Sequence, residues 1–342
     1  MRRGGTVIGH LASIMRRCGH GVTRCCPWPL ETALGGGPQK LHSDPVERIR
    51  SIGLVAGFDL LESLRSRKAI ALLLLYLIAS LGGAAIFIHV LGELRDRIAQ
   101  EAGVMGAMAT QALLRSEQLV ELIGDLVGDE ALARSLLSIP VLALFYGWFS
   151  MTFIPLLVIL TSADSIASEI ATGSARYALF RTDRLSWALG KLVGQLCLMT
   201  LGVVLGAAGA YALGLILYDG FAPGQTAWWI ARLAARSIVY GFAYLGVALC
   251  ASQLVRTRAM ARALGLLLLF AVWLAGTLLR IPSLNEWSPQ LVSAVRHLFP
   301  NAHSLDLWRP ALLDRGVAMG ALILIGLGFF ALGFVRLHRR DA

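Results

Sequence analysis

Residues 69–91 read AIALLLLYLIASLGGAAIFIHVL, a stretch that contains no Asp, Glu, Lys or Arg. An α-helix rises about 1.5 Å per residue, so a helix of this length can cross a hydrocarbon core about 30 Å thick. The basic residues Arg65, Arg67 and Lys68 come directly before it. The stretch therefore predicts a transmembrane helix that begins at a membrane surface lined with basic side chains.

Five further stretches have the length and composition of membrane spans. They are Leu136–Thr161, Leu192–Tyr218, Ser237–Leu254, Ala263–Leu279 and Val317–Val335. In the whole chain of 342 residues, 56% are hydrophobic and 15% are charged, against about 25% charged in an average soluble domain. The sequence thus predicts an all-α polytopic membrane protein with six transmembrane helices in residues 69–342. It excludes a soluble, a disordered and a disulfide-stapled chain.

The net charge of +10 is distributed unevenly over the loops between these spans. Alternate loops place 21 Lys and Arg on one side and 10 on the other, against 9 and 12 acidic residues. Because cytoplasmic loops carry the excess of Lys and Arg, both termini are predicted to be cytoplasmic, in the inner (cytoplasmic) membrane. Orientation and lipid headgroups explain the positive charge, so no nucleic-acid partner is expected.

The chain before the first span divides at residue 44. Residues 1–43 are rich in Gly, Pro and Arg without helical periodicity, and they are predicted to be a mobile cytoplasmic leader. Residues 44–68 begin with Asp-Pro, a helix start signal, and then show apolar residues about every three positions, with Asp59 outside that set. We expect an amphipathic helix in the membrane interface, with an ordinary pre-span segment as the alternative. Its expected lipid-contacting residues are Arg48, Arg50, Arg65, Arg67 and Lys68.

Two longer segments lie on the predicted outer side. Residues 92–135 contain helix formers and are expected to form a helical cap over the span ends. Residues 280–316 are amphipathic and carry Trp287 and Trp308 as interface anchors. Nothing in residues 92–135 resembles a binding motif, and cell-envelope proteins are the partners that could contact the outer segments.

GxxxG spacings in or beside the spans would let helices approach closely. Two examples are Gly202 with Gly206 and Gly316 with Gly320. The spacing predicts specific helix contacts, and ordinary packing of small residues is the alternative.

The usual chemical motifs are missing. No ionisable residue is predicted near the middle of any span, which argues against a proton- or ion-coupled carrier. Zinc-protease and serine-hydrolase motifs are absent, and Gly190-Lys191 is followed by Leu192 rather than by the Ser or Thr of a phosphate-binding loop. The five cysteines match no metal-binding spacing. We therefore expect no catalytic residue, metal or cofactor in this chain.

The loop between the second and third spans is the most informative segment. Residues 162–195 read SADSIASEIATGSARYALFRTDRLSWALGKLVGQ, and they include a polar interruption of about 30 residues between two strongly apolar helices. We expect the second span to continue into the cytoplasm, to break at Gly173, and to turn through a short helix before the chain returns to the membrane. A short transverse helix with apolar and basic residues is suited to a groove of a soluble partner.

This loop resembles that of ABC-2 permeases, the transmembrane subunits of one family of ATP-binding-cassette transporters. Their pattern has an acidic residue, Gly-Thr, a leucine pair, a Pro-containing turn, and Gly-Lys at the start of the third span. The matching positions here are Glu169, Gly173 with Ser174, Leu179, Arg184, Gly190 and Lys191. Arg181-Thr182-Asp183 stands where the Pro-containing turn is usual. The similarity extends over about residues 44–340.

The resemblance implies a half-transporter that dimerises with a second permease copy and binds two copies of a separate ABC ATPase. ATP and Mg²⁺ would be held by that ATPase, and the complex would work as an exporter. Residues 162–191 would couple the two subunits through Glu169, Gly173, Tyr177, Leu179, Phe180, Arg184 and Lys191. Among these, Tyr177, Leu179 and Phe180 would form the docking face, whereas Glu169 and Arg184 would contact the ATPase or shape the loop.

Three alternatives stay open at this stage. The chain could be a membrane anchor for a cell-envelope machine that uses the same ATPase without moving a small substrate. It could be an ion-coupled carrier. Each charged or aromatic loop residue could simply be solvated at the headgroup boundary. The sequence does not identify the transported substrate.

Overall fold

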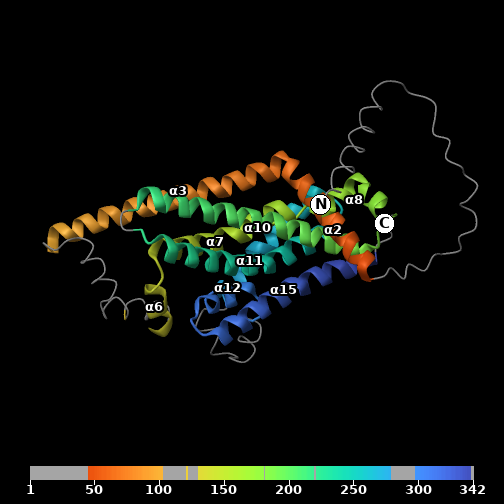
Figure 1. Cartoon of the computed structure of the whole chain (residues 1–342). Helices are drawn as coiled ribbons and strands as arrows, with labels where there is room; N and C mark the ends of the chain where they lie inside the picture. Colours follow the sequence, from red (N-terminus) through yellow and green to blue (C-terminus); the bar gives the residue numbers. More distant parts are fainter. Residues whose placement is uncertain are drawn as a thin grey trace, which may run out of the picture. The chain divides into compact units, whose positions relative to one another are not determined.

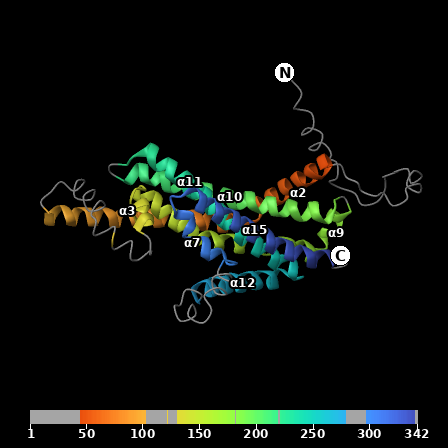
Figure 2. The same ribbon diagram turned by 90° about the horizontal axis from the view of Figure 1, so that it is seen from below.

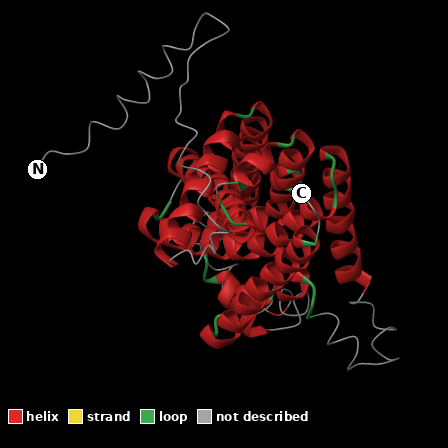
Figure 3. Ribbon diagram, turned by 90° about the vertical axis from the view of Figure 1, so that its right-hand side faces the viewer, coloured by secondary structure: helices red, strands yellow, loops and turns green. Residues whose placement is uncertain are grey.

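The computed structural model describes residues 45–102, 121, 130–180, 182–218, 221–278 and 297–339. The predicted leader, residues 1–43, lies outside the described residues, as do most of the predicted outer cap and Trp287. Every regular element in the described ranges is helical (Figure 3). The all-α prediction is therefore confirmed.

Within the ranges that the structure describes, six helices are long and apolar enough to cross a membrane, in agreement with the predicted number of spans. They are α3 (Arg67–Ala102), α7 (Val141–Ser162), α10 (Arg184–Leu217), α11 (Pro223–Leu254), α12 (Arg258–Leu278) and α15 (Leu312–His338). The shorter elements are α2 (Pro45–Arg65), α6 (Glu130–Leu137), α8 (Ser165–Thr172), α9 (Ser174–Leu179), η2 (Pro300–His303) and η3 (Asp306–Trp308). In Figure 1, α2 and α8 lie at one end of the long helices, here called the loop end, and α6 lies at the other.

Helix α11 forms the centre of the bundle. In its most apolar 18-residue window 78% of the residues are buried, compared with 22% for the same window of α3 and of α12. It packs against α7, α10, α12 and α15, whereas α12 lies at the margin of the bundle (Figure 2). A central helix that is buried on most sides must be apolar or internally satisfied all round.

The fourth span is longer than hydropathy predicts. Helix α11 starts at Pro223, a proline in its first turn, whereas the predicted span starts at Ser237. The extra turns contain Arg232 and Arg236, which lower the local hydropathy without interrupting the helix. Residues 223–236 are thus helix rather than loop. Arg236, one residue before the predicted fourth span, therefore lies within α11, and it is buried.

One predicted GxxxG pair makes a helix contact within the chain and the other does not. A Cβ built on Gly206 would lie 2.9 Å from the ring of Tyr76 in α3, and one built on Gly202 would meet Leu73. Nothing lies within 4 Å of a Cβ built on Gly316 or Gly320. The closest backbone approach involves a different pair: a Cβ on Gly246 of α11 would clash with the backbone of Gly326 in α15.

Replacing Gly246 by Ala is expected to destabilise the protein by about 1–3 kcal/mol, because the added methyl meets main-chain atoms of Gly326 that cannot rotate away. Gly320→Ala is the matched control in α15, where the new Cβ has open space and alanine favours the helix. Thermal unfolding of the purified chain in detergent measures both variants. Equal Tm values for the two would contradict the close contact between α11 and α15.

Candidate functional site

The predicted break between the second and third spans is present. Helix α7 ends at Ser162, α8 follows after a two-residue turn, and Gly173 adopts a left-handed conformation with φ +76° that reverses the chain into α9. A residue with a side chain rarely adopts this φ, so glycine suits the position. The loop therefore consists of two short helices at the loop end of the bundle (Figure 1).

Lys191 lies at the centre of the contacts that hold this loop. Its side chain is 3% exposed, and its Nζ lies 2.5 Å from a carboxylate oxygen of Asp59 in α2. The same ammonium also pairs with Glu169 in α8. One cation on α10 thus joins the helix before the first span to the loop after the second. Removing either kind of partner would leave an uncompensated charge in a buried position.

Neutral side chains complete this network. The Gln195 amide donates to the second oxygen of Asp59 at 2.7 Å, and the Ser162 hydroxyl donates to the Gln195 carbonyl at 2.9 Å. The Trp187 indole N–H donates to Glu169 at 3.2 Å. Both carboxylates therefore have a hydrogen-bond donor besides the lysine, which offsets part of the cost of burying them.

A second group of ion pairs fixes the start of the loop. Asp164, whose side chain is 11% exposed, lies 2.6 Å from Lys68 of α3 and accepts two hydrogen bonds from Arg262 of α12. The Ser252 hydroxyl of α11 accepts hydrogen bonds from the backbone N–H groups of Ile166 and Ala167, in the first turn of α8, at 3.0 Å. Helix α8 is thus attached to three other helices at its N-terminal end.

The far side of the loop presents exposed aromatic residues. Tyr177 is 78% exposed and Phe180 is 86% exposed, whereas Leu179 packs against the core of the bundle. Arg184, expected to be a polar contact or loop-shaping group, donates a hydrogen bond to the carbonyl of His338 at the end of α15. The structure therefore leaves Tyr177 and Phe180 available to a partner and turns Leu179 inward.

Asp183 determines where α10 begins. Its carboxylate accepts a hydrogen bond from the backbone N–H of Ser186, as an N-cap residue does. Partial burial opposes the charged form, but the hydrogen bonds from Ser186 and the charge of Arg48 outweigh it and hold the pKa of Asp183 below its usual range. The cap therefore replaces the Pro-containing turn of the family pattern with a different stop before the third span.

Helix α2 has two apolar faces rather than one. Ile52 and Val55 lie toward α10 together with the buried Ala56 and Asp59. The opposite face exposes large apolar side chains, namely Val46, Ile49, Leu54, Phe58 and Leu61. The expected lipid-contacting residues Arg48, Arg50, Arg65 and Arg67 are exposed, whereas Lys68 is engaged by Asp164.

Sequence reasoning missed Asp59, Gln195 and Arg262 as site residues and placed Asp59 on the polar face of its helix. A signal was present, since Ile52, Val55 and Asp59 repeat at helical spacing and Gln195 follows Lys191 by one turn. Spacing alone does not pair two helices whose contacting residues are 132 positions apart in the chain. The ionic partners could therefore not be assigned without the fold.

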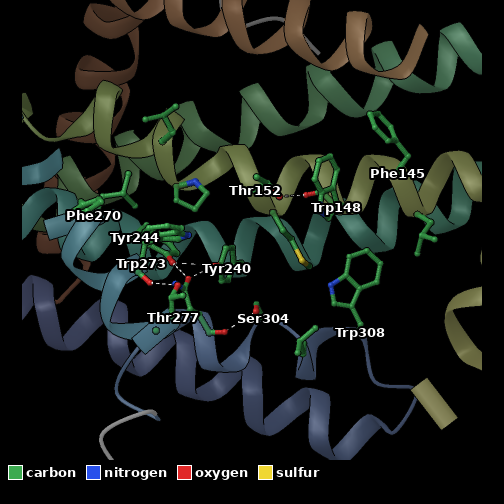
Figure 4. Close-up of a pocket in the computed structure, with 18 of the residues that line it drawn as sticks. Phe145, Trp148, Thr152, Tyr240, Tyr244, Phe270, Trp273, Thr277, Ser304 and Trp308 are labelled. Carbon is green, nitrogen blue, oxygen red and sulfur yellow. Dashed lines mark hydrogen bonds between the residues drawn. The ribbon is translucent and has the colours of Figure 1, made fainter. Parts of the chain in front are cut away.

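A large cavity of about 1150 Å³ lies between α7, α11, α12 and the segment before α15 (Figure 4). Most of its lining is apolar, with aromatic side chains that include Trp148, Phe270 and Trp273. A polar group lies at one side, where the hydroxyls of Tyr240 and Tyr244 donate to the Asn301 side-chain carbonyl at 2.9 and 2.5 Å. Such a cavity suits a molecule with a mostly apolar surface.

These features define the class of the protein. It is a multi-pass helical membrane protein in which the connection between the second and third spans is folded. Buried ion pairs attach this connection to the bundle, and its surface that faces away from the bundle exposes aromatic side chains.

A protein-family model described as ABC-2 family transporter protein matches residues 54–342. The chain therefore belongs to the ABC-2 family and is a membrane permease of an ABC transporter, which confirms the resemblance of the loop. Permeases of this family are transmembrane subunits that generally work with an ABC ATPase. No curated protein matches the chain.

Lys191→Met is expected to destabilise the chain by about 3–5 kcal/mol, because it leaves Asp59 and Glu169 as two buried carboxylates without their cation. Asp59→Asn should cost less, since Glu169 still pairs with the lysine. Lys68→Met, which removes a lysine whose side chain is 37% exposed, is the control and should cost no more than about 1 kcal/mol. Denaturant unfolding in detergent ranks the three. A Lys191→Met variant as stable as the control would rule out the central role of this network.

Asp183→Ala is expected to cost about 0.5–2 kcal/mol of stability at the start of α10, whereas Asp183→Asn keeps an N-cap side chain and should cost little. Because the folded-state pKa is lowered, the contribution of the carboxylate is complete above its unfolded-state pKa of about 4 and is lost as the pH falls through the lower, folded-state pKa. Hydrogen exchange of the Ser186 amide between pH 3 and 7 measures the contribution of the Asp183 carboxylate to the stability of the start of α10. Protection that is the same in the native chain and in Asp183→Ala would contradict the cap.

Proposed function

We propose that this permease is the membrane half of an exporter, that it works as a dimer, and that residues 162–191 receive movement from a separate ABC ATPase. The observation that carries the proposal is the loop itself, whose exposed Tyr177 and Phe180 are backed by a buried ionic network. A docking surface can transmit force only when its supports resist deformation, and this network supplies such a support.

The contacts indicate how movement would spread from the loop. A displacement of α8 acts through Glu169 on Lys191 of α10 and, through the same ammonium, on Asp59 of α2. At the other end of α8, Asp164 acts on Lys68 and Arg262. A push on one short helix would therefore reach α2, α3, α10 and α12 together, which favours rigid-body movement of the bundle end.

The remaining parts of the proposal follow if a separate ATPase supplies the energy and this chain forms the membrane path. ATP and Mg²⁺ would be bound by two copies of the ATPase, with no cofactor held by this chain. The loop end would face the cytoplasm, with the protein in the inner membrane. The exposed apolar face of α2, which includes Leu54, Phe58 and Leu61, would lie in the acyl boundary of the bilayer.

A membrane anchor for a cell-envelope machine remains the second candidate. The open cavity between α7, α11 and α12 favours transport over this alternative, because an anchor has no need of an apolar cavity of this size. An apolar cavity also supports an amphiphile or a lipid as the class of substrate.

The double variant Tyr177→Ala with Phe180→Ala is expected to weaken binding of the purified ATPase subunit at least about tenfold and to abolish ATP-dependent transport, because both side chains are exposed and contribute little to the fold. Co-purification and titration of the two subunits in nanodiscs measure it. The matched control is Leu312→Ala with Leu313→Ala, a pair of equally exposed residues at the opposite end of the bundle.

The two candidate functions give different results in the same assay. Reduced ATPase binding with an unchanged Tm supports docking through α9. Unchanged binding in the double variant would contradict it. ATPase binding without movement of any amphiphile in reconstituted vesicles would favour the anchor.

A further inference from the structure

Three arginines gather near the start of α15, in the half of the bundle away from the loop, where α15 begins beside the tenth to fourteenth residues of α11. Arg236 is 4% exposed and Arg315 is 7% exposed, and Arg232 lies one turn before Arg236 on α11. Arg232 and Arg315 both lie within electrostatic range of Arg236. Helices α11 and α15 run side by side, with Gly246 against Gly326 and Gln253 against Gly333. The same pairing, continued toward the helix starts, places Arg315 beside residue 235.

Arg236 has no partner among the residues that the structure describes. Its Nη1 atom is buried and makes no hydrogen bond, and no ion pair joins it to an acidic side chain of the described ranges. The two described carboxylates nearest to Arg315 along the chain, Asp306 and Asp314, both pair with Arg309 instead. A buried guanidinium without an anion is costly, because burial removes its water and nothing replaces it.

The surroundings indicate the depth of this cluster. The Arg232 guanidinium lies 5.0 Å from the ring of Trp229 and 5.8 Å from that of Trp228, and the Trp228 side chain is exposed. Tryptophan and arginine side chains together are typical of the boundary between headgroups and acyl chains. Arg236 lies one helical turn deeper, at a depth that the phosphate of a lipid headgroup can reach.

We propose that Arg236, assisted by Arg232 and Arg315, binds a phosphate group at this end of the bundle, carried by a lipid headgroup or free in solution. A guanidinium donates two parallel hydrogen bonds to a phosphate, and further arginines neutralise its remaining charge. Tyr240, one turn beyond Arg236 on α11, lines the apolar cavity, so an acyl chain attached to the phosphate has an apolar space close by. The site does not depend on the direction of transport or on an ATPase.

The test uses the full chain in phosphatidylcholine nanodiscs, with and without phosphatidylglycerol, and separately with inorganic phosphate. Thermal unfolding and native mass spectrometry report stabilisation and bound lipid. We expect phosphatidylglycerol to raise the Tm and to bind at least about tenfold more weakly to Arg236→Gln. Arg236→Lys should retain part of the binding. Arg256→Gln, which replaces an exposed arginine just after α11 ends, is the matched control and should bind as the native chain does.

Stability without an anion separates loss of the site from loss of the fold. In discs without phosphatidylglycerol or phosphate, Arg236→Gln should be at least as stable as the native chain, because it removes a buried charge that lacks a partner. Arg315→Gln provides an independent variant with the same expectation for binding. A Tm increase with inorganic phosphate alone identifies a free anion, and an increase only with phosphatidylglycerol identifies the lipid.

Two results would overturn the proposal. One is that neither probe changes the Tm or binds more tightly to the native chain than to Arg236→Gln. The other is that Asp219→Asn or Glu286→Gln lowers the Tm, as expected when the acidic partner of a buried arginine is removed, while neither phosphatidylglycerol nor inorganic phosphate changes the Tm. In that case an acidic residue of the chain itself would occupy the position assigned to phosphate.

Discussion

The burial of Lys191 is the constraint on which the loop end of the bundle depends. An ammonium that is 3% exposed requires anions, and the chain supplies them from two helices that flank it, α2 and α8. Because neither carboxylate tolerates burial without the lysine, the three helices form this end of the protein together or not at all. The position of α2 and the shape of the loop after α7 therefore depend on each other through Lys191.

The spans could be predicted from the sequence because lipid imposes a single rule, that a crossing helix be long and apolar. The rule failed at the start of α11, where hydropathy counts Arg232 and Arg236 as costs wherever they lie. Inside the bundle that cost depends on the neighbours. Helix α11 continues through both arginines, of which Arg236 is buried between helices and Arg232, one turn nearer the helix start, is only partly buried.

The candidate site could be predicted only in part, because some of its contacts join residues that are close in the chain and others join residues that are far apart. The break at Gly173 follows from local sequence, since a turn and its flanking residues are close in the chain, and the resemblance to ABC-2 permeases singles out Glu169 and Lys191. The role of Asp59 does not, because the contact spans 132 residues. The apolar repeat in α2 also does not predict which of the two apolar faces packs against protein. In the structure, the face that contains Asp59 packs against α10.

The two ends of the bundle manage buried charge in opposite ways. At the loop end, Lys191, Lys68 and Arg262 are each compensated by a carboxylate of the same chain, so this end is held by contacts that do not depend on the surroundings. At the other end, Arg236 has no such carboxylate among the described residues. The stability of that end must then respond to what the membrane or solvent supplies. Under the two proposals made above, this asymmetry has a use, because an end that receives force from an ATPase has to be stiff and an end that binds a phosphate group has to respond to it.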